Sequence, residues 1–268
     1  MEENVLLLVK NELNQFKPQQ IDSVLKLLDE GNTLPFIARY RKEVTGSLDE
    51  VEIKLISDKF QYVQAIEKRK EEVLRLIDEQ GKLTEELSSQ IKAAQVLQLV
   101  EDLYRPYKQK RRTKAVIAKE AGLEPLAKMI EALPREIDLN LEASKFLNEE
   151  ITTVEEALLG AHEIMAETIG DSSEFRTYLR DFTYHRGQIE STLKDKELDT
   201  RGVYEMYYEF IQNIKGLQGH RVLALNRAEK EGVIRVGIKV DLDQIHAYFK
   251  RQCIGHKSEG GAIALVEA

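Results

Sequence analysis

The sequence predicts a mainly α-helical protein with one small β element near its C-terminus, and three observations support this fold class. Only five prolines and fifteen glycines interrupt the 268 residues, which favours long helices over short strands and turns. Apolar residues recur at helical spacing through most of the first 185 residues, and several of these runs open on a residue that can cap a helix. One later region, residues 218–242, alternates as strands do.

The first two helices are predicted from their apolar stripes. Residues 6–16 carry one stripe and residues 21–28 carry a second. Pro18 stands where the second helix begins, and Gly31 follows its end, which matches the preferences of proline and glycine for helix termini. Residues 32–46 are typical of a compact connector.

A long helical stretch is predicted next. Ser47 opens a capping box with Glu50, and no strong breaker follows until Gly81, so we expect one long helix or two nearly collinear ones. Thr84 can cap the following helix, whose first turn is acidic. Residues 68–94 resemble a helix-turn-helix, but an acidic second helix is poorly suited to reading DNA bases. A structural helical hairpin fits this span better.

The second half of the chain continues with capped helices and then changes character. Thr113 can cap one helix, Thr153 and Glu156 form a second capping box, and Asp171 can cap the helix after that. Residues 220–242 hold two β-branched, alternating runs around "AEKEG", which is typical of a hairpin or a short sheet.

Charge and composition limit the class of protein. Asp and Glu number 47 against 39 Lys and Arg, a net charge of −8 that argues against a protein coating nucleic acid with its whole surface. The single Cys253 rules out an intrachain disulfide and suits a reducing cytoplasm. No window approaches a membrane span, and the N-terminal apolar run is too short for a signal peptide. We therefore expect a cytoplasmic protein without a membrane partner.

The most concentrated charge lies in "YRPYKQKRRTK", residues 104–114, which contains no acidic residue. Its six cations are Arg105, Lys108, Lys110, Arg111, Arg112 and Lys114. Such a stretch could neutralise phosphates, with Tyr104 or Tyr107 stacking on bases. The alternatives are a solvated loop, or a basic rim that pairs with the acidic helices of the same chain.

A second candidate contact lies in "LPFIARYRKEVTG", residues 34–46. Arg39, Arg41 and Lys42 surround Tyr40 there. The functional interpretation is a second contact with nucleic acid or protein. The alternative is a turn anchored in the core, whose arginines cap or pair locally.

Signals for catalysis and metal binding are weak. The five histidines are scattered, without a ligand at metal-binding spacing, and "DLD" at 241–243 is explained more simply if Asp243 caps the helix that follows. There is no P-loop, no G-x-G-x-x-G and no G-x-S-x-G motif, and Cys253 lacks a nearby basic partner. We expect no enzymatic activity, no cofactor and no metal.

Three stretches, taken together, resemble the N-terminal region of the Tex family of bacterial transcription accessory proteins. They are "GNTLPFIARYRKEVTGSLDE", "LVEDLYRPYKQKRRTKAVIAKEAGLEPLA" and "HRVLALNRAEKEGVIRV". The resemblance implies a relation to the core of a eukaryotic transcription elongation factor, and a role in transcription with nucleic-acid binding. It also implies that a complete member continues into an RNase H-like domain, helix-hairpin-helix elements and an OB-fold RNA-binding domain. This chain would correspond to roughly the N-terminal third.

The expected organisation has three parts. Residues 1–61 and 126–217 form a multihelical region, residues 62–125 an inserted helix-turn-helix-like subdomain, and residues 218–268 the β element with the start of a following domain. The expected function is a non-enzymatic scaffold that contacts the backbone of RNA or DNA, without sequence specificity, through the basic stretch. The alternative is a protein-interaction module whose basic loop docks on an acidic partner, such as the transcription machinery.

Overall fold

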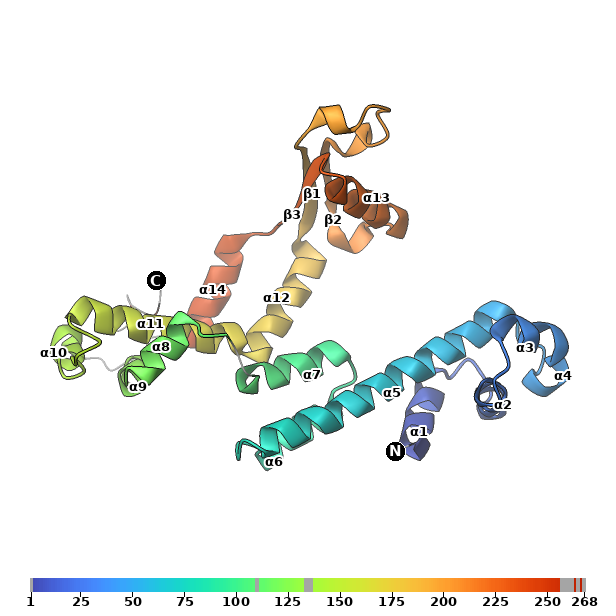
Figure 1. The fold of residues 1–268 in the computed structure, drawn as a ribbon, viewed down its shortest axis with the longest axis horizontal. Coiled ribbons are helices and arrows are strands. Elements are labelled where there is room, and N and C mark those ends of the chain that lie inside the picture. Colours follow the sequence, from blue (N-terminus) through green and yellow to red (C-terminus); the bar gives the residue numbers. More distant parts are fainter. Residues whose placement is uncertain (1, 109–110, 133–136, 256–262, 264–265, 267–268) are drawn as a thin grey trace. The chain divides into compact units, whose positions relative to one another are not determined.

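The computed structural model describes residues 2–108, 111–132 and 137–255, together with Ile263 and Val266 (Figure 1). The chain divides into two compact units, Met1–Lys108 and Gln109–Ala268. The described residues form fourteen α-helices and one three-stranded sheet, so the prediction of a mainly α-helical fold with a small β element is confirmed. The three-part division expected from the sequence stays a prediction.

The first unit is entirely helical in its described part. Its helices are α1 (Glu2–Glu12), α2 (Pro18–Asp29), α3 (Leu34–Tyr40), α4 (Lys42–Thr45), α5 (Glu50–Asp78), α6 (Glu85–Ala93) and α7 (Leu97–Tyr104), followed by the 3-10 turn Arg105–Tyr107. The connector expected over residues 32–46 thus folds into two short helices. The long stretch after it is one continuous helix, α5, which agrees with the first of the two alternatives.

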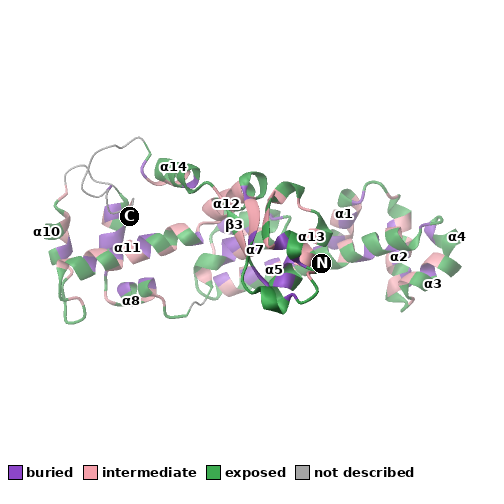
Figure 2. Ribbon diagram, turned by 90° about the horizontal axis from the view of Figure 1, so that it is seen from above, coloured by how far each residue is buried: buried purple, intermediate pink, exposed green. Residues whose placement is uncertain are grey.

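Helix α5 serves two hydrophobic cores. Its first half, through residues such as Ile53 and Ile56, packs with α1, α2 and α3. Its second half, through Val73 and Ile77, packs with α6 and α7. Figure 2 shows buried positions recurring along this helix between exposed ones. Since all four side chains are completely buried, α5 holds both cores of the unit in one continuous rod.

The capping box of α5 begins two residues later than predicted. Asp49, not Ser47, is the N-cap: its carboxylate accepts from the backbone N–H of Glu52 at 2.8 Å, and the Glu52 carboxylate accepts from the N–H of Asp49 at 2.8 Å. Gly46 and Ser47 have φ values of 68° and 64°. A residue with left-handed backbone cannot act as an N-cap, because that position requires an extended conformation.

The second unit combines helices with the sheet. Its elements are α8 (Lys114–Glu120), α9 (Glu124–Glu131), α10 (Leu139–Ser144), α11 (Val154–Asp171), α12 (Ser173–Arg186), β1 (Gln188–Leu193), β2 (Glu209–Asn213), α13 (Gly219–Lys230), β3 (Ile234–Lys239) and α14 (Leu242–Cys253). Helices α8 to α11 enclose a core around Ala157, Ala161 and Leu126. Helix α12 packs on α14 through aromatic side chains, with the rings of Tyr178 and Tyr248 stacked.

Two helix caps in this unit lie one or two residues away from the residue that the sequence predicted. Asp171 ends α11, and the hydroxyl of Ser172 caps α12 instead by accepting from the N–H of Phe175. Asp241, not Asp243, caps α14 by accepting from the N–H of Gln244 at 3.1 Å. The box of Thr153 and Glu156 and the cap of Thr113 are confirmed.

Only the last strand of the sheet, β3, lies in the part of the chain where strands were predicted. Strand order is β2-β1-β3, and both pairings are antiparallel. The first half of the predicted hairpin is wrong, because residues 219–230 form helix α13. Among its twelve residues only Val222 is β-branched, and Leu225 and Ala228 bury one helical face. The partner strands come instead from residues 188–193 and 209–213.

The loop between β1 and β2 is ordered by a buried carboxylate. Asp199 accepts from the backbone N–H groups of Val203 at 2.8 Å and Tyr204 at 2.7 Å, and from the hydroxyl of Tyr208 at 2.9 Å. Burial of Asp199 raises the pKa of its carboxyl, but the hydrogen bonds that it accepts outweigh this effect and lower the pKa below its usual value. The Asp199 carboxylate therefore holds this loop in place while it is ionised.

Tyr208 is expected to ionise late. Burial and the hydrogen bond to Asp199 raise the pKa of Tyr208 to about 12, above the value of about 10 in an unfolded chain. Between these pH values the unfolded state releases the proton first, so this residue's contribution to stability should be lost as pH rises from about 10 to 12. The chain has ten tyrosines and no tryptophan, so an absorbance titration can follow tyrosinate cleanly. The Tyr208→Phe variant should lack a late-titrating group; loss of a group that titrates near pH 10 would contradict the assignment.

Candidate nucleic-acid interface

The N-terminal part of the basic stretch is anchored in the first unit. Tyr104 is buried in the core of α5, α6 and α7, with the guanidinium of Arg69 lying 5.3 Å from its ring centroid. Arg69 also pairs with Glu101 on α7 at 2.5 Å. Because the ring is enclosed on α7, Tyr104 offers no open face to a base, and we leave it out of the proposed interface.

Tyr107 occupies an intermediate position. Its ring is half-buried against the same core, and its carbonyl accepts from the side chain of Gln80 at 2.9 Å. The side chains of Arg105 and Lys108, on either side of Tyr107, are exposed. The first unit therefore presents two cations beside one partly accessible aromatic ring.

The C-terminal part of the stretch belongs to the second unit, where the side chain of Arg111 is exposed. Arg112 pairs with Glu120 at 3.0 Å, and Lys114 pairs with Glu163 on α11 at 3.0 Å. Their side chains are nevertheless 71% and 79% exposed. Ion pairs this open to solvent contribute only about 0–1 kcal/mol each.

The start of α8 is held on α11 by a side-chain hydrogen bond and an ion pair that share one carboxylate, Glu167. The hydroxyl of Thr113 accepts from the N–H of Val116 at 3.2 Å and donates to the carboxylate of Glu167 at 2.9 Å. Lys119 reaches the other oxygen of Glu167 at 3.2 Å. The stretch thus has the acidic partners on its own chain that one of the alternatives required, alongside side chains that are open to solvent.

The six cations do not all belong to one unit. Arg105 and Lys108 lie in the first unit, whereas Arg111, Arg112 and Lys114 lie in the second. Lys110 falls outside the described residues. The two ends of the basic stretch therefore belong to different units: its first residues follow α7, and its last residues lead into α8.

The second candidate contact forms on α3 and α4. Arg39, Arg41 and Lys42 all have exposed side chains. Ile37 anchors α3 in the core, which leaves Phe36 and Tyr40 on its outer side. The segment is therefore both core-anchored, as one interpretation required, and rich in exposed cations, as the other required.

Sequence reasoning missed the exposed aromatic pair of this segment. The rings of Phe36 and Tyr40 are 5.2 Å apart, and the guanidinium of Arg41 lies 5.2 Å from the centroid of the Phe36 ring. Tyr40 is 66% exposed. The four-residue spacing of the two aromatics, which places them side by side on a helix, was the signal that could have identified them as a pair.

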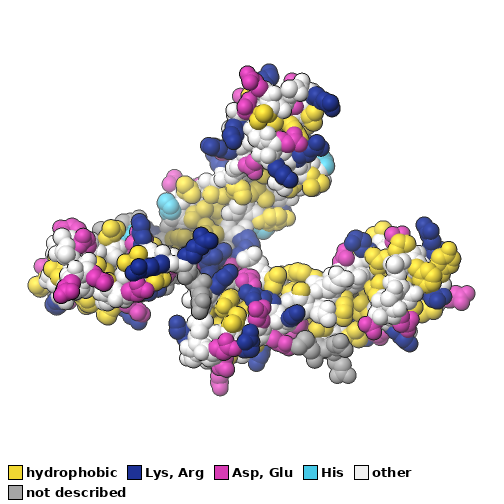
Figure 3. All heavy atoms as spheres, viewed as in Figure 1, with side chains coloured by type: hydrophobic (Ala, Val, Ile, Leu, Met, Phe, Trp, Pro, Cys, Tyr) yellow, Lys and Arg dark blue, Asp and Glu magenta, His cyan; other side chains and the backbone are white. Residues whose placement is uncertain are grey.

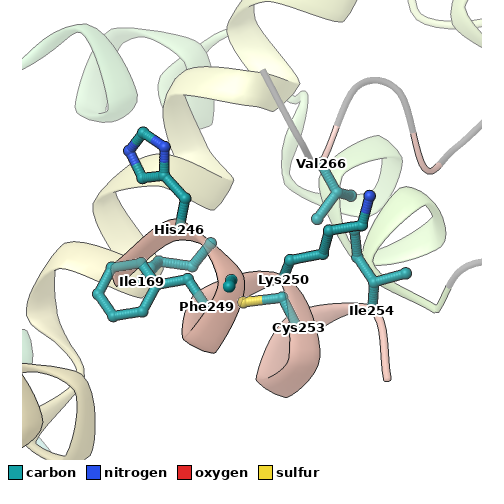
Figure 4. A pocket seen from close by; sticks show the side chains of 8 residues that line it. Ile169, His246, Phe249, Lys250, Cys253, Ile254 and Val266 are labelled. Carbon is teal, nitrogen blue, oxygen red and sulfur yellow. The ribbon is translucent and has the colours of Figure 1, made fainter. Parts of the chain in front are cut away.

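A pocket of about 390 Å³ lies between α11 and α14 (Figure 4). Its lining includes Ile169, His246, Phe249 and Cys253. Burial raises the pKa of the Cys253 thiol, which disfavours the reactive thiolate form. Among the described residues, no three side chains of His, Cys, Asp or Glu lie together as metal ligands. The expectation of a chain without enzymatic activity stays a prediction.

Among the helices of the described part, length and hydropathy are the two properties that decide whether a bilayer can be crossed. None of them is long and apolar enough to span a membrane.

Residues 3–78 match the Tex-like protein N-terminal domain, and residues 135–259 match the Tex central region-like domain. The chain therefore belongs to the Tex family.

Three relatives illustrate the range of similarity. The Bacillus subtilis protein YdcI is 51% identical over 90% of this chain and 34% of its own length. The transcriptional accessory protein Tex of Neisseria gonorrhoeae is 39% identical over 84% of this chain and 30% of its own length. The human S1 RNA-binding domain-containing protein 1 is 27% identical over 93% of this chain and 26% of its own length. The chain spans between 26% and 34% of the length of these curated relatives.

Proposed function

We propose that this chain is a non-enzymatic, nucleic-acid-associated scaffold that acts in transcription. Its relatives include a protein named for transcription accessory function and one named for an S1 RNA-binding domain, which supports a nucleic-acid role at the level of the family. One observation supports the more specific role of the basic stretch. The described cations between Arg105 and Lys114 are exposed in an otherwise acidic chain.

Phosphate contact is the mechanism that these side chains allow. Arg112 and Lys114 hold carboxylates only through solvent-exposed pairs, and such pairs cost little to exchange for a phosphate oxygen. Arg105, Lys108 and Arg111 add further positive charge. Contacts of this kind position a nucleic-acid backbone without reading its sequence. RNA and DNA of unrelated sequence should therefore bind with similar affinity.

The surface of α3 provides a second contact in this proposal. Arg39, Arg41 and Lys42 supply charge, and Tyr40 supplies an exposed ring on which an unpaired base can stack. Because stacking requires an unstacked base, this surface favours single strands over duplexes.

The test is a salt titration of binding to single-stranded RNA. Each phosphate contact contributes a slope of about −0.7 to log affinity against log salt, so full engagement of six cations gives about −4. Changing Lys108, Arg111, Arg112 and Lys114 to alanine should flatten the slope by up to about 3 and weaken binding to unrelated sequences alike. The matched control changes four cations that hold exposed ion pairs elsewhere, namely Arg75, Lys128, Lys145 and Arg227. This control removes the same amount of positive charge and should leave the salt slope unchanged.

Two outcomes would contradict the proposal. A lower melting temperature with an unchanged salt slope would make the stretch an internal clamp between α8 and α11. Absence of binding to RNA and DNA at low salt would favour the second candidate function, a protein-interaction module that docks on an acidic partner. The pairing of Arg112 and Lys114 with carboxylates of the same chain is the observation on the side of that candidate, because it shows these cations accepting protein carboxylates as partners.

A further inference from the structure

The three-stranded sheet of the second unit has two outer edges whose backbone groups are used differently. Strand β1 lies in the middle, so β2 and β3 each pair with one described strand (Figure 1). In an antiparallel pair the backbone groups of alternate residues point toward the partner strand, and those of the residues between them point away. Each outer strand therefore carries a row of N–H and C=O groups that β1 does not use.

The outer edge of β3 is capped by a side chain. The N–H of Lys194 donates to the carbonyl of Val233 at 2.8 Å, so Val233 faces β1 and, by alternation, Val236 faces outward. The outward N–H of Val236 donates to the carboxylate of Glu229 on α13 at 2.9 Å. A side chain in this position obstructs the addition of another strand.

The outer edge of β2 is not capped in the described part of the chain. The N–H of Ile214 donates to the carbonyl of Gly187 at 3.1 Å, which by the same alternation places the backbone groups of Glu209 and Ile211 on the outward side. No hydrogen bond to another described residue engages these outward groups. The strand, "EFIQN", also has neither proline nor lysine, which commonly protect edge strands. Strand β2 is therefore a template on which a further strand can pair.

An uncovered apolar side chain lies on this edge. Helix α13 packs on the sheet face that carries Phe210 and Val236. Ile211 follows Phe210 in the strand, so its side chain lies on the other face, where it is 56% exposed. A strand added beside β2 would place one of its own side chains next to Ile211, and an apolar one would gain stability by covering it.

Two carboxylates beside Ile211 indicate the charge of the occupant. Glu190 lies opposite Ile211 on β1, and Glu209 lies two residues along β2 on the same face. Neither forms an ion pair with another described residue. The cations of this face, Arg235 and Lys239, lie on β3, on the far side of β1. Figure 3 shows side chains of both signs over the part of the second unit that holds the sheet, so their local placement decides the partner. Negative charge beside β2 favours a cationic side chain on the added strand and disfavours a nucleic-acid backbone.

The outward backbone row and the charge beside it together define the partner. Backbone groups spaced along an edge strand are matched by another extended chain, in the strand-addition mode of peptide recognition, and alternate side chains supply the specificity. We propose that β2 binds an extended segment of a partner protein, with a basic residue beside Glu209 and an apolar residue beside Ile211. This inference goes beyond the proposed function and does not depend on it, because β2 contains no residue of the basic stretch or of α3.

The probe is a fluorescein-labelled peptide of about seven residues, in which lysine and valine occupy one face and threonine the other. Measured by fluorescence anisotropy, the whole chain should bind it saturably, with affinity falling as salt rises. Two N-methylated forms of the peptide test for strand addition without altering the protein. Methylating one alternate set of backbone nitrogens should abolish binding and methylating the other set should leave it, because only one set of N–H groups can face β2.

Proline substitutions on the two edges provide a matched pair of variants. Ile211→Pro removes an outward N–H from β2 and Ile238→Pro removes one from β3, so neither takes a donor from the pairing with β1. Peptide binding should be lost in the first variant and retained in the second, and circular dichroism should show both folded. Glu209→Lys should weaken binding of the lysine peptide by about fivefold or more.

Three results would overturn the proposal. One is the absence of saturable peptide binding up to about 1 mM, and another is an equal effect of the two methylation patterns. The third is a dimer of the chain that excludes the peptide and is lost in Ile211→Pro, which would make a second copy the occupant of the edge. RNA binding through the basic stretch should be unchanged in Ile211→Pro, so failure of one proposal is distinguishable from failure of the other.

Discussion

Changing Gly160 to alanine is expected to destabilise the second unit. Gly160 lies within α11, where α8 and α9 pass close to it. A Cβ at this position would be 2.3 Å from Cδ1 of Leu123 and 3.2 Å from Cβ of Ala118. Leu123 is completely buried, so its side chain must repack against the surrounding core to make room. Overpacking of this kind costs about 1–3 kcal/mol in free energy of unfolding.

The direction of this effect is opposite to that expected from helix propensity, which favours alanine over glycine by about 1 kcal/mol. Gly170 provides the matched control in the same helix, because a Cβ there would meet no atom within 4 Å. Denaturant unfolding followed by circular dichroism should therefore show Gly160→Ala destabilised and Gly170→Ala unchanged or stabilised. Equal stability of the two variants would show that α8 and α9 do not pack on α11 as described.

The second large effect is expected from truncating one core at a time. Ile91 on α6 and Ile130 on α9 are completely buried, and they belong to the cores of the first and second unit respectively. Changing either to alanine should cost about 2–5 kcal/mol, because the cavity left behind closes only partly. Each change should act on its own unit.

Hydrogen exchange read segment by segment is the appropriate measurement, since it reports local opening free energies. Ile91→Ala should lower protection in α5, α6 and α7 and leave α9 and α11 unchanged, and Ile130→Ala should do the reverse. Val51→Ala is the control, because Val51 is exposed and its truncation removes few contacts. Loss of protection throughout the chain in either core variant would mean that the two units unfold as one.

Local chemistry was sufficient at several positions where a signal acts within four residues. The cap of Thr84, the box of Thr153 and Glu156, and Pro18 at the start of α2 are each visible in a short window of sequence, and each is present in the structure. Caps were misplaced by one or two residues at Asp49 and Ser172. Several polar residues compete at such a site, and the backbone conformation chooses among them.

Exposure at the candidate sites could be predicted only in part. The charge of the basic stretch is a property of the sequence, and the described cations that carry it have exposed side chains. The burial of Tyr104 was not predictable, since it depends on α5 and α6 packing against α7. The outer face of α3, with Phe36 and Tyr40, became visible only once Ile37 was known to point inward.

The sequence by itself determined that this protein is mainly helical, where several of its helices begin, and that its positive charge is concentrated in one stretch. These properties depend on hydrogen bonds and side-chain spacing within a turn or two of the chain. Only the tertiary structure decided that residues 219–230 form a helix, that β1 pairs with both β2 and β3, and that Ile214 and Ile238 meet α12 in a groove. Strand partners and helix faces are chosen by apolar burial between segments far apart in sequence, and a local pattern carries no record of that choice.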